Sequence, residues 1–149
     1  MLSVGEAIAR MWRHWGGRSE APQPPDLRLF IAPLSPAPCW HPAKARDGTQ
    51  LLQVVVHLEA RNTTDHDIRI TSVRLRDHPV EQATFTVALQ PGDWLGRDFP
   101  VAARRMAHLM VMLFVRGQRY TPGETFSDVV LLCDEQGREH RLKITVRGR

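Results

Sequence analysis

Cysteine is scarce in this sequence, with only Cys39 and Cys133 among 149 residues. Small secreted domains that depend on disulfides carry far more cysteine, so this pair does not indicate a disulfide framework. The chain also lacks an apolar run long enough to cross a bilayer. The first residues lack the apolar core of a secretory signal, since Gly5, Glu6 and Arg10 interrupt them. We therefore expect a cytoplasmic protein.

The motifs of the common catalytic families are missing as well. The sequence contains no G-x-S-x-G, H-E-x-x-H, P-loop or G-x-G-x-x-G pattern. Its acidic residues are scattered and often fall in predicted turns, where they bond their own backbone. We expect no catalytic residues, no cofactor and no enzymatic activity.

The stretch QLLQVVVHLEARN, residues 50–62, has the pattern of a strand with one buried face. Its apolar side carries Leu52, Val54, Val56, Leu58 and Ala60. Its other side carries Gln53, His57, Glu59 and Arg61, with Val55 as the exception. This alternation is typical of antiparallel sheets that cover a core.

Strands and turns then repeat to the end of the chain. We count about seven strands with no helical period between them, which predicts an antiparallel β-sandwich or barrel. The apolar parity switches at Thr71-Ser72, which predicts a β-bulge. Leu27, Leu29 and Ile31 predict an edge strand before a proline-rich segment.

The order of strands after a proline-rich lead, with HLEARNTTDHDIRITSVRL as a strand–turn–strand unit, resembles bacterial immunoglobulin-like β-sandwich modules. The resemblance covers roughly residues 26–147. It implies an immunoglobulin-like antiparallel sandwich of about seven strands, the architecture of many binding, spacing and assembly modules. The Cys…Trp…Cys spacing of antibody domains is absent, so the resemblance extends to architecture only.

Three zones are predicted: an amphipathic helix at 1–16, a proline-rich linker at 17–25 and the β-sandwich domain at 26–149. The apolar stripe of the helix consists of Val4, Ile8, Met11, Trp12 and Trp15. Three roles for this helix remain open. It docks on its own domain, inserts into a groove of a partner, or lies on an anionic membrane surface through residues 1–18.

The segment RMAHLMVMLFVR, residues 105–116, is apolar on both faces. Because the outer face of a sandwich is normally wet, its outward side chains require a cover. We therefore predict a non-enzymatic protein-interaction or assembly module that binds a protein partner or a second copy of itself. The predicted contact residues are Val4, Ile8, Met11, Trp12, Trp15, Met110, Met112 and Phe114.

An alternative function is a soft-metal carrier that uses Met106, His108 and Met110. Thioethers and imidazoles suit copper. Against this, residues two apart on one strand are separated by about 7 Å, so we expect packing rather than metal binding to explain the methionines.

A zinc site that joins Cys39 and His41 to Cys133 or His140 is a weaker alternative, because tight double-ligand spacings are absent.

A cationic stripe on the last predicted strand raises the question of nucleic acid. The stripe consists of Arg141, Lys143, Arg147 and Arg149. Aromatic platforms for bases are lacking beside it. Cations on a solvated edge strand also discourage aggregation between sheets. We therefore do not expect a nucleic-acid partner.

Overall fold

The computed structural model describes residues 26–87, 94–95, 99–116 and 120–149, with the backbone alone described at 85–87 and 94–95. These residues form ten strands and no helix. The strands are β1 (Leu27–Ile31), β2 (Cys39–Lys44), β3 (Gln50–Asn62), β4 (Ile68–Leu75), β5 (Val80–Val87), β6 (Trp94–Leu95), β7 (Phe99–Val101), β8 (Met106–Arg116), β9 (Thr125–Asp134) and β10 (Glu139–Gly148). The predicted helix and linker lie outside the described residues. In the described part, no helix has the length and apolarity needed to cross a membrane.

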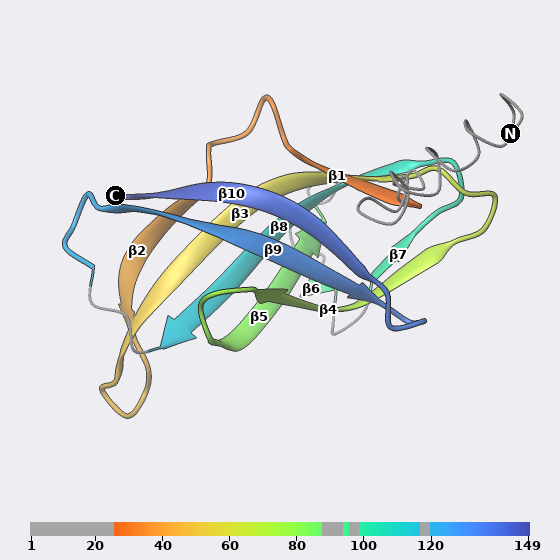
Figure 1. Cartoon of the computed structure of the whole chain (residues 1–149). Coiled ribbons are helices and arrows are strands. Elements are labelled where there is room, and N and C mark those ends of the chain that lie inside the picture. The colour runs from red at the N-terminus through yellow and green to blue at the C-terminus, as the bar shows by residue number, and fades with distance from the viewer. Residues whose placement is uncertain (1–25, 88–93, 96–98, 117–119) are drawn as a thin grey trace, which may run out of the picture.

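The strands form one continuous hydrogen-bonded sheet in the order β6-β5-β8-β3-β2-β10-β9-β4-β7. The sheet curls, so that β3, β8 and β5 form one layer while β10, β9 and β4 cross over them (Figure 1). The chain passes between the layers directly from β4 to β5. The prediction of an all-β fold is confirmed. The immunoglobulin-like sandwich is not confirmed, because the two layers are joined as one curled sheet.

The two layers are joined where β2 meets β10. β2 pairs antiparallel with β3 along its whole length but parallel with β10 over two residues only, with Cys39 opposite Arg147 and Trp40 opposite Gly148. β1 pairs with the other end of β3, from Asn62 to Leu58. β1 and β2 therefore lie one after the other along the same edge of β3, separated by the proline-rich loop.

Trp40 stabilises this junction between β2 and β10. Its side chain is fully buried, and its indole Nε1–H donates to the carbonyl oxygen of Glu124 at 2.8 Å. The ring lies so close to Gly148 that a Cβ there would come within 2.8 Å of it. Any residue larger than glycine at position 148 would displace the Trp40 ring or the strand. The residues on either side of Trp40, Cys39 and His41, are held in register by the same strand pairing.

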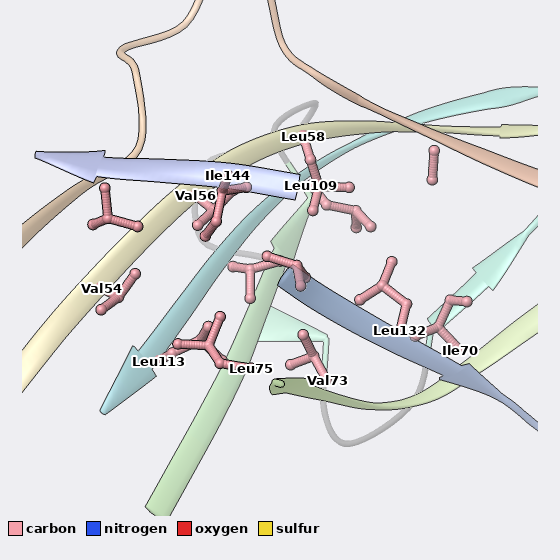
Figure 2. Packing of buried hydrophobic residues seen from close by; sticks show 14 of the residues in the cluster. Val54, Val56, Leu58, Ile70, Val73, Leu75, Leu109, Leu113, Leu132 and Ile144 are labelled. Atoms are coloured by element: carbon pink, nitrogen blue, oxygen red, sulfur yellow. The ribbon is translucent and has the colours of Figure 1, made fainter. Parts of the chain in front are cut away.

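The hydrophobic core lies between the two layers. Figure 2 shows side chains from β3, β8, β4, β9 and β10 pointing toward one another across this space. The labelled residues are Val54, Val56, Leu58, Ile70, Val73, Leu75, Leu109, Leu113, Leu132 and Ile144, all of them buried. The predicted apolar side of β3 is the core side, so the period-two pattern is confirmed. The predicted bulge is also confirmed, by the shift in the pairing of β4 with β9 between Ile70 and Ser72.

The turn between β9 and β10 is closed by the buried carboxylate of Asp134. One oxygen accepts the backbone N–H groups of Gln136 and Arg138, and the other lies 2.9 Å from Nε2 of His140 and 3.1 Å from Nε of Arg138. Burial raises the pKa of Asp134, but the His140, Arg138 and Gln136 hydrogen bonds outweigh it and hold the pKa below its usual value.

Shortening a core side chain should destabilise the domain. Leu132 is fully buried, so Leu132→Ala should lower the free energy of unfolding by about 2–5 kcal/mol. Leu34→Ala is the matched control, because Leu34 is fully exposed and its loss should change little. Urea denaturation measures both values, and equal stability of the two variants would contradict the core described above.

Acid should weaken the domain through Asp134. Since the folded-state pKa lies below the unfolded value of about 3.9, the ionised carboxylate stabilises the fold above that pH. This contribution is lost as the pH falls through the folded pKa. Asp134→Asn should therefore flatten the loss of stability below about pH 4, whereas Asp65→Asn, at an exposed aspartate, should leave it unchanged. Urea melts across this range measure the effect, and parallel curves for Asp134→Asn and wild type would refute it.

Candidate functional site

The outer face of β2, β3 and β8 gathers most of the nitrogen and sulfur donors of the described residues. Antiparallel partners point to the same side of the sheet, so the register of β2, β3 and β8 defines this face. We call it the donor face; it consists of Cys39, His41, His57, Glu59, Met106, His108, Met110 and Met112. It lies on the opposite side of the sheet from the core.

His57 of β3 lies directly opposite Met110 of β8. The Cβ atoms of such a pair are about 5 Å apart, so an imidazole nitrogen and a thioether sulfur point out side by side. Both side chains are half-buried. Burial lowers the pKa of His57, which keeps the ring neutral at neutral pH, the form in which histidine binds metals.

His108 is the next donor along β8, diagonal to His57. Its cross-strand partner is Glu59, whose Oε1 lies 3.7 Å from the His108 Nδ1. A carboxylate facing Nδ1 leaves Nε2 as the nitrogen available to a ligand. Glu59 is largely buried, so its carboxylate needs a partner such as His108.

The other two methionines on this face are less available. The sulfur of Met112 accepts a hydrogen bond from Nε2 of Gln53 at 3.0 Å. Met106 is exposed at the start of β8 and lies opposite Arg61, a cation that disfavours a second positive charge. Met106 and Met110 are also four residues apart, about 13 Å along a strand. The predicted set of Met106, His108 and Met110 is therefore not gathered at one point, whereas His57, His108 and Met110 are neighbours.

Among the predicted contact residues, Met110, Met112 and Phe114 lie half-buried on the outer side of β8. The helix residues Val4, Ile8, Met11, Trp12 and Trp15 lie outside the described residues. The structure thus places three of the eight predicted contact residues on the outer side of β8.

The predicted zinc set does not assemble. Cys39 lies opposite Arg147 on β10, whereas Cys133 lies opposite Glu139 on the same strand, eight residues or about 26 Å away. His140 is bonded to Asp134 instead. Both cysteines are free thiols. In the described part of the chain, no three His, Cys, Asp or Glu side chains come together in a way that would hold a metal ion.

A second polar cluster is buried beside the core and was not predicted. His78 Nδ1 lies 2.5 Å from Oδ2 of Asp128, and His78 Nε2 lies 2.8 Å from the hydroxyl of Tyr120. Oδ1 of Asp128 accepts the backbone N–H groups of Asp77 and Val129. Burial raises the pKa of the Tyr120 hydroxyl, with the charges of Glu124 and Asp128 adding to the effect, so it stays protonated.

This cluster is a closed network. Both ring nitrogens of His78 and both carboxylate oxygens of Asp128 have partners, which leaves no group directed at a ligand. Its three residues lie far apart in the sequence, so no local spacing could have revealed it. We interpret it as a structural connection between the β4–β5 turn, β9 and the segment before it.

No family model matches the chain, and no curated protein sequence matches it. Two PCuAC domains are among the solved structures that share its fold. The apo PmoF2 PCuAC domain has a TM-score of 0.55 and 13% sequence identity, covering 83% of this chain and 90% of that domain. The copper-bound PCuAC domain from PmoF2 has a TM-score of 0.52 and 14% identity, covering 83% of this chain and 94% of that domain. At such low identity the likeness establishes the fold alone.

Breaking the buried cluster should destabilise the protein without affecting the donor face. Asp128→Ala leaves His78 and two backbone N–H groups without their partner, so it should lower the free energy of unfolding by about 3 kcal/mol. Asp77→Ala, which removes an exposed carboxylate paired with Arg76, is the control and should cost less than about 1 kcal/mol. Denaturation with urea gives both values. A cost for Asp128→Ala no larger than that of the control would show that the network is not structural.

Proposed function

We propose that this protein is a non-enzymatic copper carrier that binds Cu(I) on the donor face through His57, Met110 and His108. The observation that carries the proposal is the strand register, which places His57 directly opposite Met110 with His108 next to both. The fold shared with a copper-bound domain supports the same conclusion.

The donor set fits a soft cation. Thioether and neutral imidazole groups favour Cu(I), while harder ions prefer oxygen. Both histidines and Met110 are only half-buried, so an ion could reach them from solvent. Glu59 lies on the Nδ1 side of His108, where it would orient the ring and leave its other nitrogen toward the metal. The chain's own residues thus supply a face on which copper would be held near the surface and released again.

A carrier must release its cargo to an acceptor, and this connects the proposal to the predicted interaction module. Met110 would be both a copper ligand and part of the contact surface, with Met112 and Phe114 beside it. Half-buried apolar groups around a metal site suit a transient protein contact. We therefore propose that the partner of this face is a protein that accepts copper.

Removing either His57 or Met110 should weaken Cu(I) binding. His57→Ala and Met110→Leu should each lower the affinity for Cu(I) by at least about tenfold, because loss of an outer-shell partner alone costs 10–100-fold. Met106→Leu is the matched control, since Met106 lies on the same strand but opposite Arg61. Competition with a chromogenic Cu(I) chelator, under anaerobic conditions, measures the affinities.

Two results would contradict this proposal. If Met106→Leu weakens binding while Met110→Leu does not, the site lies elsewhere on β8. If the wild-type protein fails to compete for Cu(I) at micromolar concentrations, the carrier function is wrong.

A further inference from the structure

Cys39 and His41 are two of the donors on the donor face that the proposed site does not use. They are two residues apart on β2 and lie opposite Val55 and Gln53 of β3, so both point away from the core. Trp40 between them points the other way and is anchored to Glu124. The pair is therefore held on a short, fixed segment of strand.

The separation of the two donor atoms suits one metal ion. Sγ of Cys39 lies 3.9 Å from Nε2 of His41. With bonds of about 2.3 Å to sulfur and 2.0 Å to nitrogen, as in zinc sites, a single ion would join them at an angle of about 130°. The two donor atoms are thus much closer together than the roughly 7 Å that separates alternate residues along a strand.

The number of donors points to the kind of metal. Structural zinc requires four ligands, and in the described residues no third His, Cys, Asp or Glu joins this pair. Cu(I) accepts low coordination numbers, and thiolate is among its preferred ligands. Cys39 is buried and His41 half-buried, which limits competition from water while leaving one side of the pair accessible.

The pair is also close to the first site. Cys39 lies opposite Val55, and His57 is the next residue of β3 on the same face. Such diagonal neighbours are about 7–8 Å apart, a distance that long side chains can bridge. An ion bound by His57 and Met110 would thus be one ligand exchange away from Cys39.

We propose that Cys39 and His41 form a second Cu(I) site, adjacent to the His57–Met110 site, so that the donor face holds two copper ions or passes one between two positions. The role in transfer rests on the proposed function, whereas the existence of the second site rests on the Cys39–His41 geometry alone. No oxidation or reduction is involved, because copper enters and leaves as Cu(I), and the Cys39 thiol releases its proton to solvent when it binds.

The test is an anaerobic Cu(I) titration of the full chain that follows both stoichiometry and the ultraviolet charge-transfer band of a copper thiolate. The wild-type protein should bind two equivalents and show the band. Cys39→Ser should lose one equivalent and the band, and His41→Asn should bind that equivalent at least about tenfold more weakly. Cys133→Ser is the matched control, because Cys133 is the other free thiol and lies far from this pair.

Two further results separate the proposals. Met110→Leu should keep the thiolate band while losing the other equivalent. If it binds as the wild type does but Cys39→Ser loses the band, the carrier site at His57 and Met110 is wrong and the Cys39–His41 site stands.

Retention of the band in Cys39→Ser, or its loss in Cys133→Ser, would overturn the second site. Thermal melts check that each variant is folded. If the buried Cys39 does not tolerate serine, His41→Asn tests the second site instead. Unchanged Cu(I) binding by His41→Asn would also overturn the site.

Discussion

β3 and β8 pair without interruption from Leu51 opposite Arg116 to Arg61 opposite Met106, and this is the longest pairing among the described strands. One side of the pair supplies Val54, Val56, Leu109 and other residues to the core. Because side chains alternate, the same register also decides which polar groups meet on the other side. A slip of one residue would expose the core residues and bury the donors. Core packing therefore stabilises the geometry of the donor face, although none of its donors belongs to the core cluster between the layers.

The junction between β2 and β10 is the second constraint. It consists of only two paired residues, yet it joins the two layers, and Trp40 holds it from the core side. Cys39 and His41, the outward-facing residues on either side of Trp40, are held in place by the same contacts. In preorganised sites of this kind the scaffold orders the ligands before the metal arrives, which reduces the entropy lost on binding. The two proposed copper positions thus depend on two different elements of the fold and can be tested independently.

Local patterns predicted much of the architecture. The alternation in residues 50–62 identified the core face of β3, and the parity switch at Thr71-Ser72 identified a bulge, because both depend only on neighbouring residues. β2 was not predicted, because it follows directly on the proline-rich segment and itself contains Pro42, and proline lacks the N–H that a central strand donates. The structure places Pro42 where β2 is paired only with β3, so the missing N–H faces no partner. The parallel pairing of β2 with β10, and hence the single curled sheet, joins distant segments that no local pattern relates.

The candidate site, too, could be predicted only in part from local sequence patterns. His108 and Met110 were recognised as soft donors from one strand, and His57 was recognised as outward-facing. Their meeting could not be predicted, because it depends on the register of β3 against β8. The objection that donors on one strand lie too far apart also proved too strict, since Cys39 and His41 approach to 3.9 Å on β2. The buried cluster of His78, Tyr120 and Asp128 likewise results from the fold rather than from any spacing in the chain.

The proposed function requires that Cu(I) binds where His57 faces Met110. The most direct measurement is nuclear magnetic resonance of the methyl groups of the five methionines during addition of Cu(I) to the Cys39→Ser protein. We expect the first equivalent to shift the Met110 methyl signal strongly, together with the ring signals of His57 and His108, while the Met106 signal stays in place. A titration that shifts Met106 and leaves Met110 and His57 unchanged would contradict the account.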